Sequence, residues 1–154
     1  MTFEEVKELG IIYHHKFVVL QQMNIIIQEL IKRAQDHDNS KFSEEEFPFL
    51  VKAMDDLHKV QFGTPEYAEV REKWSGLFNS HYKKNSHHPE FYPNGIEDMN
   101  LLDLVELLCD WKAASMRKEN GGTISNSIRV GTERYGLSSQ LVKILENTAR
   151  ACKM

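Results

Sequence analysis

The first third of the chain is a long run of apolar residues at helical spacing, and it constrains the fold most. Between about Phe3 and Ala34, apolar side chains recur every three or four positions, as they do on the buried face of an α-helix. These positions are Val6, Leu9, Tyr13, Leu20, Met23, Ile27, Leu30 and Ile31. A second, weaker line of Ile11, Val18 and Ile25 predicts a central helix that is covered on two sides.

Capping signals mark the helices that follow. Ser43 and Glu46 form a possible capping box, with Pro48 either inside the first turns of this helix or starting it afresh. Thr64 as the N-cap and Pro65 at the first helical position predict a third helix, which delivers His81 at its C-terminal end.

The C-terminal half is also predicted to be helical. Residues 99–120 predict a helix that ends at Gly121-Gly122, and residues 138–153 predict a final helix. Residues 121–136 are ambiguous and fit a loop around a short helix. Because no segment alternates as a strand does, the prediction is an all-α fold of about five to seven helices in a single domain over residues 1–154.

Charge and composition exclude several classes of protein. The formal net charge is −4 and no cationic stripe is present, which disfavours binding to duplex nucleic acid. No apolar run approaches the roughly 18 residues of a membrane span, so no membrane association is expected. The acidic start "MTFEEVKELG" is unlike a secretory signal and predicts a cytoplasmic protein. Cys109 and Cys152 fit reduced packing residues.

Histidines gather in one short segment. The stretch "HYKKNSHHPE" holds His81, His87 and His88, three of the seven histidines of the chain, and nearby prolines and glycine predict a loop. The adjacent His37 and Asp38 follow the first predicted helix. Imidazole and carboxylate together suit Zn, Mn, Fe or Co better than calcium.

Simpler interpretations exist for each of these residues. Asp38 could form a turn with the polar residues after it, and the histidine segment could be an exposed loop. Asp110 lies on one polar helix face with Asp103, Glu106 and Arg117, which is typical of a solvated surface with charge pairs. The small residues Ala113 and Ala114 beside it would let other helices approach closely.

These motifs resemble the HD-domain metal-dependent phosphohydrolases, all-helical proteins whose signature is a histidine, an adjacent His-Asp and a distant helical aspartate. His15 in "HKFVV", His37-Asp38 and Asp110 in "LLCDWKAAS" match that signature. The segment "HHPEFYPNGI" is similar to a motif of the binuclear branch that cleaves cyclic dinucleotides, although Pro89 is inserted and the Asp-Gly turn is missing. The whole chain resembles more closely an uncharacterised family of short bacterial and phage proteins with "HDxSKFS", "NxHHPE" and "LCDWKAAS".

The resemblance implies an HD-like helical bundle with one or two divalent transition-metal ions (Mn, Zn, Fe, Co or Ni, with Mg possible). The implied ligands to the first ion are His15, His37, Asp38 and Asp110, with His14 as the alternative to His15. His81, His87 and His88 would bind a second ion or contact a phosphate. Such ions supply hydroxide at neutral pH and clamp the oxygens of the reacting phosphate.

The remaining predicted site residues would bind substrate or move protons. Lys41 would contact a phosphate oxygen, and Glu90 or Asp103 would protonate the leaving group, Asp103 also being a fallback ligand. The predicted substrate contacts are Asn85, Tyr82, Tyr92, Arg117 and Arg129. Phe91 is a further stacking candidate.

The expected function is hydrolysis of a small phosphoester, such as a nucleotide, through a metal-activated water. Two alternatives stay open: an HD scaffold that sequesters a nucleotide or inhibits a partner protein, and a di-iron oxygenase of HD type. Apolar surface on the first or last helix could support a homodimer.

Overall fold

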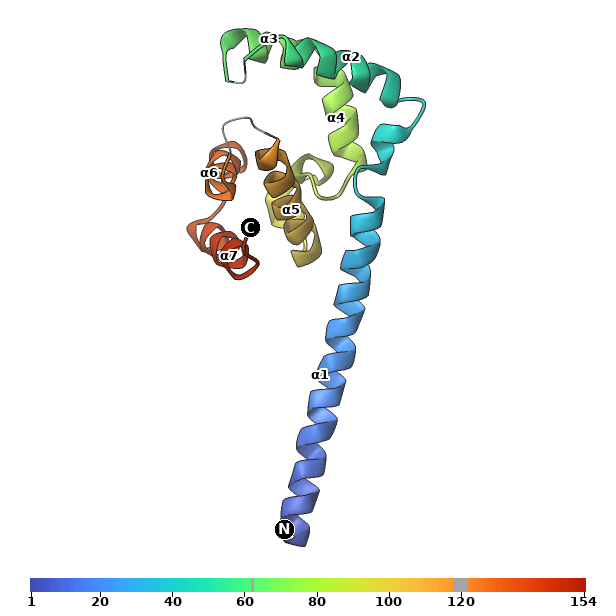
Figure 1. Cartoon of the computed structure of the whole chain (residues 1–154), viewed down its shortest axis with the longest axis vertical. Coiled ribbons are helices and arrows are strands. Elements are labelled where there is room, and N and C mark those ends of the chain that lie inside the picture. Colours follow the sequence, from blue (N-terminus) through green and yellow to red (C-terminus); the bar gives the residue numbers. More distant parts are fainter. Residues whose placement is uncertain (62, 118–121) are drawn as a thin grey trace. The chain divides into compact units, whose positions relative to one another are not determined.

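The computed structural model describes residues 1–61, 63–117 and 122–154, and within them the chain is helical without a strand (Figure 1). The α-helices are α1 (Phe3–Asp36), α2 (Phe47–His58), α3 (Pro65–Lys73), α4 (Ser75–Lys84), α5 (Leu101–Met116), α6 (Ile124–Tyr135) and α7 (Ser139–Ala151). Three short 3₁₀ turns are η1 (Asn39–Phe42), η2 (Pro89–Phe91) and η3 (Gly95–Asp98). The predicted all-α fold of five to seven helices is confirmed.

The chain divides into two compact units, which are described separately. The first is Met1–His37, which contains α1, and the second is Asp38–Met154, which contains all the other helices. The expectation of one domain over residues 1–154 stays a prediction.

Helix α1 is one unbroken helix, as the apolar spacing predicts. Thr2 accepts a hydrogen bond from the Glu5 backbone N–H, and the Glu5 carboxylate accepts one from the Thr2 N–H. This reciprocal capping box fixes the start of the helix. None of the residues of α1 is buried.

The predicted second and third helices are present with different boundaries. Ser43 caps a turn through the Glu46 N–H, and α2 begins after Glu46 with Pro48 in its first turn. Thr64 caps α3 as predicted, but the helix breaks at Trp74 and α4 begins at the next residue. The indole N–H of Trp74 donates to Asp56 of α2, so a contact distant in sequence accompanies this break.

The apolar core of the second unit is formed by α5, α6 and α7, which pack against one another (Figure 1). Its buried members are Leu108, Ile124, Ile128, Leu137, Leu145 and Ala149. Each of these side chains removes apolar surface from water, which is the main favourable contribution to folding.

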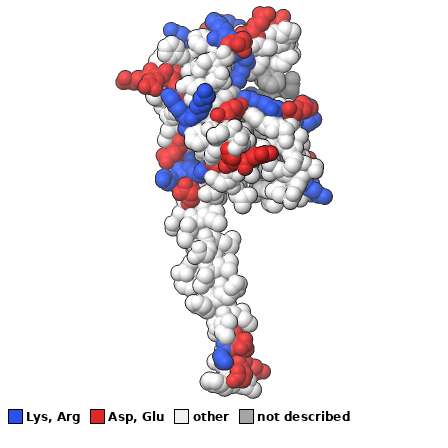
Figure 2. Space-filling model, turned by 180° about the vertical axis from the view of Figure 1, so that it is seen from behind, with Lys and Arg blue, Asp and Glu red and all other residues white. Residues whose placement is uncertain are grey.

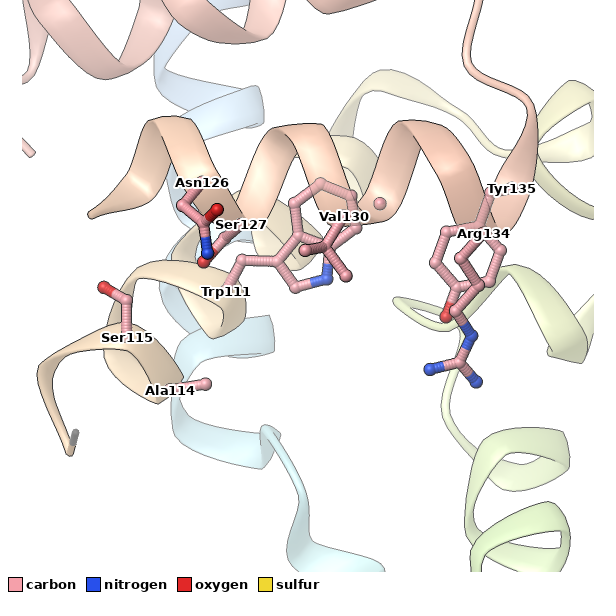
Figure 3. A pocket seen from close by; sticks show the side chains of 9 residues that line it. Trp111, Ala114, Ser115, Asn126, Ser127, Val130, Arg134 and Tyr135 are labelled. Carbon is pink, nitrogen blue, oxygen red and sulfur yellow. The ribbon is translucent and has the colours of Figure 1, made fainter. Parts of the chain in front are cut away.

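Helix α6 occupies most of the segment that is ambiguous in the sequence. Thr123 caps it through the Asn126 N–H, and Gly136 ends it in the left-handed conformation with φ 66°. Trp111 reaches from α5 across to α6, beside Val130 (Figure 3). A Cβ atom at Gly131 would overlap the indole ring of Trp111, so this close approach requires glycine. The predicted stop of α5 at Gly121 lies outside the described residues.

Candidate metal centre

Four side chains of the second unit converge on one point. Asp38, His81, His87 and His88 each offer one donor atom, and these four atoms all lie within 4.8 Å of one another. His81 comes from the last turn of α4, His87 and His88 from the segment before η2, and Asp38 from the start of η1. Three histidines and one carboxylate are a donor set typical of first-row transition metals.

The separations between the donor atoms fit a single ion. The Nε2 atom of His81 lies 3.1 Å from Oδ1 of Asp38 and 3.2 Å from Nε2 of His88. The Nε2 atom of His87 lies 3.6 Å from the same Asp38 oxygen. Ligands about 2.0–2.1 Å from a tetrahedrally bound Zn²⁺ lie roughly 3.3 Å apart, so these distances match that geometry.

The outer nitrogen atoms of two of these histidines face carboxylates. Nδ1 of His87 lies 3.0 Å from Oε1 of Glu106, and the His87 side chain is 2% exposed. Nδ1 of His81 lies 3.4 Å from Oε2 of Glu46 and 3.1 Å from the Ser40 hydroxyl. A carboxylate that accepts the Nδ1 proton leaves the Nε2 lone pair for a metal, and it also fixes the orientation of the ring.

Glu46 is a buried acid that stays ionised. Its side chain is 3% exposed, and its carboxylate forms an ion pair with Lys84 at 3.0 Å and accepts a hydrogen bond from Ser40 at 3.2 Å. Burial would raise the pKa of Glu46, but the hydrogen bonds from Lys84 and Ser40 outweigh it and hold the pKa below its usual range. The negative charge behind His81 makes that imidazole a stronger donor.

His88 is neutral over the physiological range. Burial, followed by the neighbouring His87 and His81, lowers the pKa of His88 to about 3. A neutral imidazole has a lone pair that is available to a metal ion.

Local backbone structure brings these donors together. Helix α4 ends at Asn85, whose amide group donates to the His81 carbonyl oxygen at 2.8 Å. The His88 N–H then donates to the Asn85 carbonyl oxygen at 3.0 Å, and Pro89 starts η2. Asp38 adopts a left-handed conformation with φ 58°, which aspartate tolerates better than most residues.

A pocket of about 600 Å³ adjoins the donor cluster and lies wholly within the second unit. His81, His88 and Asp110 line it, together with the cations Lys41, Arg71, Arg117 and Arg134. The apolar part of the wall consists of Leu50, Met54, Leu57, Leu77 and Phe78. The pocket thus combines potential metal donors, positive charge and apolar surface.

Two arginines of this pocket are positioned by aromatic rings. Arg71 donates to the Tyr82 hydroxyl at 2.8 Å, and its guanidinium lies 3.8 Å from the centre of the Phe78 ring. The guanidinium of Arg134 lies 5.4 Å from the centre of the Tyr82 ring and forms an ion pair with Glu90 at 2.5 Å. Cation–π contacts of this kind hold an arginine in place while leaving its charge intact.

Several predicted site residues are brought together, as the sequence suggests. Asp38, His81, His87 and His88 form the donor cluster, and Asn85 donates to Ser40 beside it at 3.0 Å. Lys41 forms an ion pair with Asp38. Tyr82, Asp110 and Arg117 line the pocket. His37 is the C-cap of α1 and directly precedes Asp38 in the chain.

Other predicted residues are placed differently. His15 lies 22 residues before His37 in one unbroken helix, a separation of about 33 Å along the helix axis at 1.5 Å per residue. The two histidines of one chain therefore cannot bind the same ion. His14 neighbours His15 on this helix and is likewise too far from His37 to bind the same ion.

Four further predicted residues form contacts outside the donor cluster: Asp103, Tyr92, Glu90 and Arg129. Asp103 accepts hydrogen bonds from the Asn100 N–H at 3.0 Å and from the Tyr92 hydroxyl at 2.7 Å, so it caps α5, and no donor group among the described residues includes it. Glu90 pairs with Arg134. Arg129 pairs with Glu133 one turn further along α6 and does not line the pocket.

Sequence reasoning missed the supporting residues of the site. Glu106 appears in the sequence only as one member of a polar helix face, and Glu46 only as part of a capping signal. Ser40, Arg71 and Arg134 carry no local signal. All five act through contacts between segments distant in the chain, which spacing along one helix does not reveal.

No described helix is long and apolar enough to cross a membrane. No curated protein and no solved structure matches the chain. One family model matches residues 4–151, which is nearly the whole chain, and its description is a family of unknown function (DUF5662). The chain therefore belongs to the DUF5662 family.

Proposed function

We propose that the protein is a metal-dependent phosphohydrolase that acts on a small phosphoester. One observation carries the proposal: four convergent metal donors adjoin a pocket that also holds three arginines and a lysine. A cluster of donors alone would fit a structural ion. The pocket beside it offers a substrate direct access to that ion.

The donor chemistry supports a first-row transition metal. Asp38 supplies one hard oxygen, and His81, His87 and His88 supply three borderline nitrogens. Glu46 and Glu106 hold the outer nitrogens of His81 and His87, as outer carboxylates do in zinc sites. A divalent ion in such a site lowers the pKa of a bound water toward neutrality and thereby supplies the nucleophile for hydrolysis.

The cations of the pocket would bind the phosphate. Arg71 and Arg134 are held by Tyr82 and other aromatic rings, so they present positive charge at fixed positions. Lys41 and Arg117 line the same pocket. Charge-assisted hydrogen bonds from such groups strengthen as negative charge develops on the phosphate oxygens.

The apolar wall would accept the rest of the substrate. Leu50, Met54 and Leu77 offer surface to an apolar or aromatic group, such as the base of a nucleotide. Asp103 caps α5 and Glu90 pairs with Arg134. We therefore assign protonation of the leaving group to neither of these acids.

The first test is metal content, measured by mass spectrometry on protein purified without a chelator or a histidine tag. We expect about one transition-metal ion per chain, and hydrolysis of a phosphoester in a screen of nucleotides and generic phosphate esters. His81→Ala should lose both the metal and the activity. His15→Ala is the matched control and should keep both, because His15 lies far along α1.

Other outcomes would favour the alternatives. A bound metal without turnover of any phosphoester would favour a protein that sequesters its ligand. Two irons and oxygen consumption would favour the oxygenase. The absence of any bound metal after incubation with Mn, Zn, Fe and Co would contradict the proposal.

A further inference from the structure

Helix α1 carries a heptad repeat along its whole length. Counted from Val6, apolar residues alternate at spacings of three and four, which is the pattern of a coiled-coil seam. The a positions are Val6, Tyr13, Leu20, Ile27 and Ala34, and the d positions are Leu9, Lys16, Met23 and Leu30. Lys16 is the one polar residue of this seam.

The flanks of the seam are apolar as well. Ile12, Val19 and Ile26 occupy g positions, and Phe17 and Ile31 occupy e positions. Ile12 is 61% exposed and Phe17 56% exposed. In Figure 2, the surface of α1 shows no charged side chain between its N-terminal turns and its C-terminal end on the face displayed. Apolar surface on this scale marks an interaction site.

We propose that α1 pairs with α1 of a second copy of the chain, in antiparallel orientation. In the register that this repeat favours, each a residue meets a d residue of the other copy. Val6 then lies opposite Leu30, Leu9 opposite Ile27, and Tyr13 opposite Met23. This proposal is independent of the proposed enzymatic function.

The position of Lys16 selects the antiparallel orientation. In a parallel pair, the two Lys16 side chains would occupy the same layer of the seam, and their like charges would repel. In the antiparallel register, Lys16 lies opposite Leu20 of the second copy. The aliphatic part of the lysine can pack there while its ammonium group reaches water.

The charges at the two ends of the helix are complementary in the same orientation. Glu5 and Arg33 both occupy g positions, and antiparallel helices face each other g to g. Each Glu5 therefore faces Arg33 of the second copy, at both ends of the pair. Arg33 also lies 3.8 Å from Glu29 within its own helix, and its side chain is 19% exposed.

Cysteine cross-linking tests the orientation directly. In a background with Cys109→Ser and Cys152→Ser, two variants of the full chain are made, Leu9→Cys and Ile27→Cys. In the antiparallel pair, the two copies of residue 9 lie about 27 Å apart along the axis. A disulfide needs Cα atoms within about 7 Å. Neither variant should cross-link alone, whereas a mixture of the two should form a disulfide-linked dimer under mild oxidation.

The controls separate orientation from mere proximity. Gln21→Cys lies on the polar side of the helix and should not cross-link, alone or mixed with Leu9→Cys. Light scattering of the unmodified chain should give twice the mass of one chain, or four times if Ile11, Val18 and Ile25 join two such pairs. Circular dichroism checks that each variant folds.

Three outcomes would overturn the proposal. Cross-linking of each single variant with itself would show a parallel pair. A monomer at micromolar concentrations would show that α1 does not pair with a second copy. If that monomer also binds lipid vesicles, the apolar surface of α1 would be assigned to a membrane. A dimer in which the 9–27 mixture forms no disulfide, although both variants fold, would place the interface elsewhere.

Discussion

The donor cluster and the apolar core lie in the same unit, but they bury different kinds of side chain. The core formed by α5–α7 buries Leu108, Ile128 and Leu145, and each of these side chains stabilises the fold by leaving water. The cluster buries His81 and His87, and the free-energy cost of burying these polar groups is offset by their contacts with Glu46 and Glu106. The contrast indicates that burial of apolar surface in the core, more than the cluster, drives folding.

Helix α5 joins these two regions. Leu107 and Leu108 of α5 are buried, whereas Glu106 of the same helix contacts His87 and Asp110 lines the pocket. Substitutions on one side of α5 should therefore change stability, and substitutions on the other side should change metal binding.

The largest expected effect comes from the core. Leu108→Ala removes a side chain that is 1% exposed and should lower the free energy of unfolding by about 2–5 kcal/mol. Urea denaturation followed by circular dichroism measures this. The folded fraction should bind metal with the affinity of the unsubstituted protein. A large loss of metal affinity in the folded fraction would contradict the expectation that the core affects stability and not metal binding.

Gly131 tests the close approach of α5 and α6. Gly131→Ala forces a Cβ into the Trp111 ring and should cost about 1–3 kcal/mol of stability, as overpacking does. Alanine favours helix over glycine by about 1 kcal/mol, so an isolated helix would respond in the opposite direction. Thermal unfolding measures whether the substitution lowers or raises the stability. A stabilised Gly131→Ala variant would contradict the close contact between Gly131 and the Trp111 ring.

Glu106 tests the other side of α5. Glu106→Gln removes the charge that faces Nδ1 of His87 at 3.0 Å. The metal affinity should fall by about 10–100-fold, with little change in stability. Competition with a coloured chelator measures the affinity. Glu133→Gln on α6 is a matched control, because Glu133 is exposed, belongs to no donor group and does not line the pocket. An equal loss there would point to general electrostatics.

Acid should destabilise the metal-free protein through His88. Its pKa is about 3 in the folded state, below the value of about 6.5 expected in the unfolded chain. Between these values the unfolded state binds the proton and the folded state does not. The contribution of neutral His88 to the free energy of unfolding is therefore fully present above pH 6.5 and is lost as the pH falls toward 3. The slope should approach about 1.4 kcal/mol per pH unit. Urea unfolding of His88→Gln between pH 7 and pH 5 should show a flatter profile.

The smallest effect is expected at a helix cap remote from the site. Ser138→Ala removes the hydroxyl that accepts from the Leu141 N–H at 3.2 Å at the start of α7 and should cost about 1 kcal/mol. Metal affinity should not change. Ser139→Ala leaves that cap in place, and an equal loss of stability there would argue against the capping role.

Much of the local structure follows from the sequence. The spacing of apolar residues predicts α1, and the cap Thr64 predicts the start of α3, because these signals act within a few residues of the chain. The same continuity of α1 already separates His15 from His37. The resemblance to an HD signature pointed to His15 and His37 as ligands of one ion. An unbroken helix of this length holds these two histidines too far apart to bind it together.

Tertiary packing decided what spacing could not. The break at Trp74 accompanies a hydrogen bond to α2, and Gly131 lies inside a helix because Trp111 approaches it there. The sequence by itself determined an all-helical chain with a local group of histidines. Only the tertiary structure brought Asp38 to those histidines and set Glu46 and Glu106 behind them, because donors from separate segments converge only when the helices that carry them pack.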